Sequence, residues 1–267
     1  MIWRDDITLP FYGDYMLKKI WIPALLIILL LLSACSSTKA IQQMSPEKAK
    51  QTADNFFARG KYKKATPYYQ KIINESSTIL LADAQMRLAD CFFFRKEYID
   101  ARFEYEEFIR QFNDHPQVAR VFFQIGICYY KLSLDAHYDQ DETFSAIDAF
   151  TEYIDRFPFD ENKKEAVEYI KECRYKLLEK KYHNGYAYYK LSDFPSALLY
   201  FNEIIQLNNH DELDKKAIFY SAKMYLYRKD LENTDLMLAK LNQKYPDDKK
   251  TEIIQHKRDK LAKKLEE

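Results

Sequence analysis

The sequence of 267 residues predicts an all-α protein, a solenoid of about five helix–turn–helix repeats. Composition and pattern carry this prediction. The chain holds only 4 glycines, too few for the tight turns of a β-rich fold, whereas 22 tyrosines and 18 phenylalanines suit helices that pack through aromatic rings. The pattern is a small residue followed four positions later by a bulky one, and it recurs along the chain. We expect the repeats to span residues 45–80, 81–116, 117–160, 161–211 and 212–248.

The charge balance bears on the kind of partner. Lysine plus arginine equals aspartate plus glutamate, at 41 each, so the formal net charge is zero. Proteins that bind nucleic acid normally carry a basic stripe, so the composition gives no electrostatic case for nucleic acid. A neutral surface favours proteins as partners.

The first 34 residues have the order of a signal peptide. Lys18 and Lys19 precede the apolar run 20–32, and the small residues Ser33 and Ala34 follow it. A membrane-spanning helix needs about 20 apolar residues, and Pro23 interrupts this shorter run, so an uncleaved anchor is the weaker alternative. Residues 1–15 are acidic and fit a signal peptide poorly. We therefore expect the true start at Met16.

The end of this segment predicts lipidation. Leu32, Ser33, Ala34 and Cys35 resemble the bacterial lipobox, whose cysteine becomes N-terminal and carries acyl chains such as palmitate. Several acyl chains, at about 0.8 kcal/mol per buried CH₂, anchor a protein durably. Ser36 in place of aspartate resembles the outer-membrane sorting class. We expect a periplasm-facing outer-membrane lipoprotein with a polar tether over residues 35–44 and a first helix that begins at Ser45 and Pro46.

The repeat pattern involves both helices of each repeat. The second helix carries a small residue and then a bulky one, at Ala65/Tyr69, Ala101/Tyr105, Ala146/Phe150, Ala197/Phe201 and Thr234/Leu238. The first helix carries a small residue and an aromatic three positions later, at Ala53/Phe56, Ala89/Phe92, Gly126/Tyr129, Gly185/Tyr188 and Ala222/Tyr225. The small residues let paired helices approach closely. The unit resembles the tetratricopeptide repeat (TPR) of about 34 residues, which stacks into a right-handed superhelix. Amphipathic helices with coincidental alanines are the alternative.

Three segments depart from the repeat spacing. Residues 132–142 (LSLDAHYDQDE) replace the short turn of the third repeat, and residues 162–181 lengthen the first helix of the fourth. The apolar positions of 162–181 share one helical face, which predicts a long helix linking two halves of the solenoid. Residues 249–267 are charged with sparse apolar positions. We favour a capping helix there over a partner-binding one.

No catalytic, metal or cofactor site is predicted, and we expect no enzyme. The chain lacks CxxC and HExxH motifs, and the acidic run 139–142 lacks the glycine and distal glutamate of an EF-hand. Cys91, Cys128 and Cys173 are predicted to be core thiols. The covalent lipid on Cys35 is the only attached group that we expect.

The ordered set of lipobox, tether, five repeats, inserted loop and long helix resembles the outer-membrane assembly lipoprotein of the BamD family. Residues 108–116 (FIRQFNDHP) resemble that family's junction after repeat two, although Asn113 stands where its proline is usual. Residues 144–158 (FSAIDAFTEYIDRFP) are likewise similar. The resemblance covers about residues 35–249.

The resemblance implies a function that the composition does not. It implies a TPR scaffold in the β-barrel assembly (BAM) complex that supports folding and insertion of outer-membrane proteins. Its C-terminal repeats would bind the periplasmic POTRA domains of a BamA-like insertase, its N-terminal repeats would bind unfolded β-barrel proteins, and other assembly-complex lipoproteins would join it. The alternative is a TPR lipoprotein scaffold that coordinates cell-envelope division or peptidoglycan synthesis.

Candidate contacts follow from repeat geometry and from the resemblance. Certain offsets of the first helix face the concave side of a TPR solenoid, and they predict a client groove formed by Lys50, Asp54, Phe57, Met86, Asp90 and Phe93. Packing between repeats is an equal alternative for Phe57 and Phe93. The family has an insertase-contacting arginine on the long connecting helix. Leu177 aligns there and Arg174 precedes it by almost one turn, so Arg174 is the predicted contact.

Overall fold

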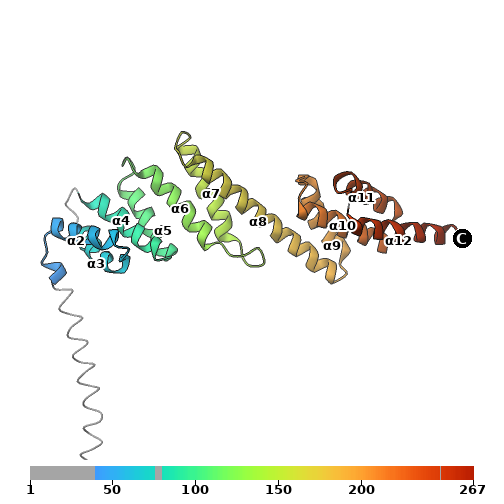
Figure 1. Cartoon of the computed structure of the whole chain (residues 1–267), viewed down its shortest axis with the longest axis horizontal. Helices are drawn as coiled ribbons and strands as arrows, with labels where there is room; N and C mark the ends of the chain where they lie inside the picture. The colour runs from blue at the N-terminus through green and yellow to red at the C-terminus, as the bar shows by residue number, and fades with distance from the viewer. Residues whose placement is uncertain (1–39, 76–79, 247) are drawn as a thin grey trace, which may run out of the picture. The chain divides into compact units, whose positions relative to one another are not determined.

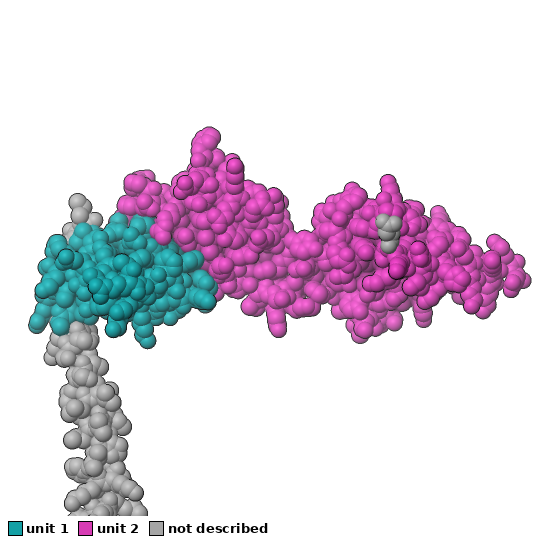
Figure 2. All heavy atoms as spheres, in the orientation of Figure 1, with its two compact units in different colours: residues 1–108 teal, residues 109–267 magenta. Residues whose placement is uncertain are grey.

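Every regular element in the described part of the chain, residues 40–75, 80–246 and 248–267 of a computed structural model, is a helix. The signal peptide, Cys35 and residues 36–39 of the tether lie outside these residues. The chain divides into two units, residues 1–108 and 109–267 (Figure 1, Figure 2). Within the described residues, no helix is both long and apolar enough to cross a membrane.

The first unit contains helices α2 (Pro46–Ala58), α3 (Tyr62–Asn74) and α4 (Leu81–Phe94) and most of α5 (Tyr98–Gln111). The helix start predicted at Ser45 is confirmed, because the Ser45 side chain accepts a hydrogen bond from the Lys48 amide and Pro46 is the first helical residue. Gly60, with φ of +67°, makes the turn that follows α2. The core joins small and large side chains: Ala49, Ala53, Ala65, Tyr69, Ile72, Ala84, Leu88 and Cys91.

The second unit continues the pairing with seven described helices. They are α6 (Val118–Leu132), α7 (Asp141–Arg156), α8 (Lys163–Lys190), α9 (Phe194–Leu207), α10 (Glu212–Tyr227), α11 (Leu231–Lys244) and α12 (Lys249–Glu266). Each helix from α7 to α12 packs on the one before it. The predicted fold class, an all-α TPR-type solenoid, is confirmed.

The pattern residues lie where two helices cross most closely. A Cβ atom added to Gly126 of α6 would lie 2.6 Å from two ring carbons of Phe150 on α7, and one added to Gly185 of α8 would lie 2.9 Å from the Phe201 ring on α9. The two bulky residues, Phe150 and Phe201, are fully buried. The small residue of the first helix therefore contacts the bulky residue of the second helix in these repeats.

The long helix predicted before the fourth repeat is α8, which runs for 28 residues. Ala166, Ile170, Cys173 and Leu178 are buried along it, on the face that the periodicity indicated. Both α7 and α9 pack against α8, so it supplies the first helix of the fourth repeat and also lines the third.

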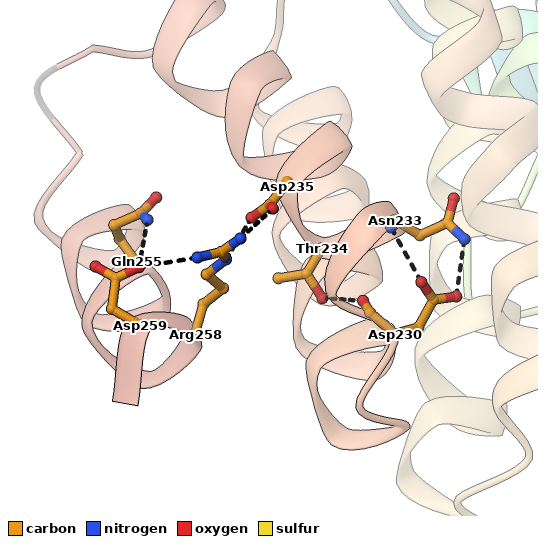
Figure 3. Close-up of polar contacts among 7 residues, drawn as sticks. All are labelled: Asp230, Asn233, Thr234, Asp235, Gln255, Arg258 and Asp259. Carbon is orange, nitrogen blue, oxygen red and sulfur yellow. Dashed lines mark hydrogen bonds and ion pairs between the residues drawn. The ribbon is translucent and has the colours of Figure 1, made fainter. Parts of the chain in front are cut away.

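The last helix is held to α11 by a two-pronged ion pair. The Arg258 Nε and Nη2 atoms lie 2.6 and 2.5 Å from the carboxylate oxygens of Asp235 on α11 (Figure 3). Thr251 and Ile254 of α12 are buried beside this contact. Bidentate Arg–carboxylate pairs fix orientation as well as distance, so this pair fixes how α12 lies on α11.

Candidate binding surfaces

Lys50, the first of the predicted groove residues, forms ion pairs that join α2 to α4. The Lys50 ammonium lies 2.8 Å from Asp54 on its own helix and 2.7 Å from Asp83 on α4. Burial lowers the pKa of Lys50, but its hydrogen bonds to Asp54 and Asp83 outweigh that effect, and the net shift is upward. Lys50 is therefore a fixed cation on a half-buried face of the first unit.

Asp54 and Asp90 each accept a hydrogen bond from the second helix of their own repeat. The Tyr69 hydroxyl donates to Asp54 over 2.7 Å, and the Tyr105 hydroxyl donates to Asp90 over 2.6 Å. Burial and the bond to Asp54 raise the pKa of Tyr69. Asp90 is only 1% exposed and Met86 8%, so the structure places these two predicted groove residues in the packing.

Phe57 and Phe93 belong to an aromatic cluster with Tyr62, Phe94 and Tyr98. Phe57 meets Tyr62 edge to face at 5.2 Å and Phe94 at 5.9 Å, while Phe93 lies 5.8 Å from Phe94 and 5.5 Å from Tyr98. Phe57 thus packs between repeats, which was the alternative for this residue. The Arg87 guanidinium also lies over the Phe57 ring, with its Cζ atom 4.9 Å from the ring centroid.

The member of the cluster that sequence reasoning missed is Phe94. Its ring stacks on Tyr62 at 4.9 Å and is 50% exposed, more than Phe57 or Phe93. The run Phe92-Phe93-Phe94 was the available signal, because three consecutive helical positions span too wide an arc to be buried together.

The second unit has a cleft of about 820 Å³ where the inserted loop faces α8. The cleft contains both residues considered for the insertase contact, Arg174 and Leu177, which lie one turn apart on α8. Its lining is His137, Tyr138, Asp139, Gln140, Asp141, Phe144, Arg174, Leu177, Leu178, Lys180, Lys181 and Leu207. The exposed apolar side chains of Tyr138, Phe144 and Leu207 lie beside charges of both signs.

The inserted loop is held in place by α8 side chains. The Lys176 ammonium donates to the Ser133 hydroxyl over 2.7 Å, and the Lys180 ammonium donates to the His137 carbonyl over 3.0 Å. Inside the loop, the Gln140 amide donates to the Asp135 carbonyl over 2.8 Å. One wall of the cleft is therefore ordered by bonds that no local pattern could reveal.

Two imidazoles meet in the same region, with the His137 and His183 ring centroids 3.7 Å apart. Burial lowers the pKa of His183, and His137 lowers it further. Lys180 acts in the same direction, whereas Glu179 and Asp135 raise the pKa without reversing the shift. The surroundings of His183 therefore favour its neutral form.

Cys91, Cys128 and Cys173 are buried in the helical core, as predicted. Burial raises the pKa of Cys91 to about 12 and that of Cys173 to about 11, and Cys128 is also buried. Thiols with pKa values this high carry almost no thiolate at neutral pH, so they contribute packing rather than chemistry.

A family model described as YfiO, outer membrane lipoprotein, matches residues 42–184. A search among curated proteins found no match. One similar solved structure, the TPR2AB-domain:pHSP90 complex of yeast Sti1, is 16% identical, with 82% of this chain and 84% of that chain covered and a TM-score of 0.44. A tetratricopeptide repeat protein from Parabacteroides merdae is 15% identical (81% and 72% covered, TM-score 0.36), and pilF of Pseudomonas aeruginosa is 16% identical (80% and 98%, TM-score 0.33).

Proposed function

The chain belongs to the YfiO family of outer membrane lipoproteins, and from this premise we propose that it is a scaffold of the β-barrel assembly machinery. The predicted resemblance to the BamD family is thereby confirmed. In our proposal the protein is anchored at the periplasmic face of the outer membrane through a lipid on Cys35. It binds the POTRA domains of a BamA-like insertase and unfolded β-barrel clients, and it acts by binding rather than by catalysis.

The observation that carries the proposal is the family match over residues 42–184, which include α2 to α7 and most of α8. Both candidate surfaces contain residues from that range. Stacked helix pairs pack on their neighbours and present extended, rigid surfaces, which suits a protein that binds two partners at once.

We place client binding on the exposed side of the first unit. The surface consists of Lys50, Asp54, Phe57, Phe93 and Phe94, because Met86 and Asp90 are buried. An extended terminal strand of a barrel protein presents alternate large apolar side chains, and the aromatic cluster offers them the exposed ring of Phe94, while Lys50 lies on the same face of α2 as Phe57.

This surface can be tested with a peptide that copies the C-terminal strand of an outer-membrane barrel protein. Phe94→Ala is expected to weaken binding at least tenfold, because truncating an aromatic at the centre of an interface costs about 2 kcal/mol. The matched control is Phe103→Ala, since Phe103 is 58% exposed in the same unit and lies outside the cluster. Equal losses in the two variants, with both chains folded, would remove this surface from the proposal.

We place the insertase contact in the cleft of the second unit, with Arg174 as its cation. Arg174→Glu is expected to abolish capture of purified POTRA domains, because reversing a charge at an interface adds repulsion to the lost attraction. Lys164→Glu is the control, since Lys164 is an exposed cation on α8 that does not line the cleft. Undiminished capture by Arg174→Glu would place the contact elsewhere.

One experiment tests the proposal as a whole. The full chain is purified from detergent-solubilised outer membranes and its companions are identified. Recovery of a large barrel protein with repeated periplasmic domains is the expected result. Recovery of peptidoglycan enzymes alone would replace the proposal with an envelope-division scaffold. Cys35→Ala should leave the repeats folded and release them from the membrane, and a variant that stays bound would contradict the lipid anchor.

A further inference from the structure

A second hollow in the second unit lies between α10 and α12, apart from the inserted loop. Its volume is about 310 Å³, at the lower end of the roughly 300–1,000 Å³ typical of ligand pockets. We call it the terminal groove. It is lined by Phe219, Lys223, Leu226, Tyr227, Lys250, Ile253, Ile254 and Lys257.

The α10 wall of the groove repeats the positions that predicted a binding surface in the first unit. Phe219, Lys223 and Leu226 stand at the same offsets from Ala222 as Lys50, Asp54 and Phe57 stand from Ala53. These offsets share one face of a first helix. The α10 wall of the groove is therefore formed by side chains at fixed positions of the repeat.

The other wall of the groove is one face of α12. Lys250, Ile253, Ile254 and Lys257 follow the i, i+3, i+4, i+7 spacing of a single helical face. This face is directed toward α10, because its residues line the groove together with α10 residues and Ile254 is buried. The Arg258–Asp235 ion pair holds α12 to α11 (Figure 3). Ile253 remains 57% exposed in the groove, and Tyr227 on the facing wall is 77% exposed.

The charges of the terminal groove are of one sign. Its lining contains three lysines and no carboxylate. In the described part of the chain, no ion pair joins Lys223, Lys250 or Lys257 to an acidic side chain. The Lys223 ammonium lies over the rings of Tyr189, Tyr220 and Phe219, 5.3, 5.4 and 5.7 Å from their centroids, so among the described residues aromatic faces and not a carboxylate surround it.

We propose that the terminal groove binds an acidic amphipathic segment of a partner protein. One or two large apolar side chains of that segment enter between Leu226, Tyr227 and Ile253, and carboxylates on either side of them pair with the lysines. Charge complementarity identifies the partner, because the walls supply all the cations and none of the anions of such an interface. The inference goes beyond the proposed function, which stands or falls on other residues.

Two other occupants fit the groove less well. A second copy of this chain would bring another lysine-rich α12 against the same lysines, which like-charge repulsion disfavours. An anionic membrane surface attracts cations on an outward face, whereas these lysines flank a recess lined by aromatic and branched side chains.

The test is selection of short random peptides displayed on phage against the full chain in detergent. The enriched peptides should be acidic and contain a large apolar residue. Lys250→Glu with Lys257→Glu should weaken a selected peptide at least tenfold, since two attractions become repulsions. The matched control is Lys249→Glu with Lys260→Glu, which makes the same charge change at exposed α12 positions outside the groove.

A second pair of variants tests the apolar part of the groove. Ile253→Ser should weaken the selected peptide, and Leu265→Ser should not, although Leu265 is 53% exposed on the same helix. Hydrogen-exchange protection by the peptide should fall on α10 and α12.

Several results would overturn the inference. They are enrichment of peptides without net negative charge, equal losses in the two lysine pairs, or protection elsewhere in the chain. Loss of binding to anionic lipid vesicles in the Lys250/Lys257 variant, with peptide binding intact, would instead assign the groove to the membrane. A dimer that Ile253→Ser dissociates would assign it to a second copy of the chain.

Discussion

The buried ion pair between α10 and α11 offers the clearest test of how the second unit is held together. The Asp214 side chain is fully buried and the Lys244 side chain is 10% exposed, and their charged atoms lie 2.8 Å apart. The Tyr245 hydroxyl also donates to Asp214, over 2.9 Å. Asp214 thus has one cation and one neutral donor in a place that water scarcely reaches.

Lys244→Met keeps the length of the side chain and removes its charge. Breaking a buried pair from one side costs about 3–5 kcal/mol, because the remaining charge is left without compensation. Tyr245 still donates one hydrogen bond to Asp214, so we expect the lower end, about 3 kcal/mol. Since repeats are stabilised mainly by their neighbours, the loss should be concentrated in α10 to α12.

The assay is urea unfolding followed by circular dichroism, with hydrogen exchange to locate the effect. The control is Lys181→Met, because the Lys181–Glu203 pair is 2.5 Å long but close to half exposed on both sides. An exposed pair contributes about 1 kcal/mol or less. Asp214→Leu added to Lys244→Met should recover most of the stability, since both charges are then gone. Equal effects of the two Met substitutions would refute the role assigned to burial.

Three other outcomes are expected elsewhere in the chain: at a close helix crossing, at the inserted loop and in the core of the first unit. Gly126→Ala should lower the free energy of unfolding by about 2 kcal/mol in thermal melts, because the 2.6 Å approach to Phe150 puts the overpacking cost at the upper end, about 3 kcal/mol, and helix propensity returns about 1; an unchanged melting temperature would show that the ring can move. The pKa of His183 lies below its ordinary value, so the stability from its neutral contact with His137 is present above about pH 6.5 and is lost as the pH falls through the lowered pKa. The protection factors of the amides in residues 133–141, which correct for the pH dependence of intrinsic exchange, should therefore fall between pH 7.5 and pH 5.5, and equal protection factors at the two pH values would contradict this. Cys91, with its pKa raised to about 12, should resist alkylation at pH 8 until the chain is unfolded, and rapid labelling of the folded chain would contradict its burial.

The helix pairs could be predicted from the sequence because their signal is local. Ala65, Ala101, Ala146, Ala197 and Thr234 are all fully buried, at the close crossings where the pattern placed them. Thr234 shows how the position tolerates a polar residue, since its hydroxyl donates to the Asp230 carbonyl over 2.6 Å (Figure 3). Because this contact is repeated at fixed offsets, the same pair of residue types recurs along the sequence and can be recognised in one chain.

The binding surfaces could be predicted only in outline. Repeat offsets indicate the direction of a side chain and not its partner, so the bonds of Asp54 and Asp90 to tyrosines could not be foreseen. The order of the inserted loop comes from Lys176 and Lys180, 43 residues further along the chain than the atoms they bind. Such long-range polar contacts have no period, and the sequence therefore showed an insertion without its conformation.

The first two repeats and the fifth use the same offset in opposite ways, and the bulky residue of the second helix differs between them. Where that residue is a tyrosine, as in the first two repeats, its hydroxyl binds the aspartate beside the small residue of the first helix. In the fifth repeat the bulky residue is Leu238, which has no hydroxyl, and the offset carries Lys223. An aspartate there would have no donor on the second helix, whereas a lysine can reach solvent over neighbouring rings. The side chain at this one offset is thus bonded within the chain in the first two repeats and is available to a partner in the fifth.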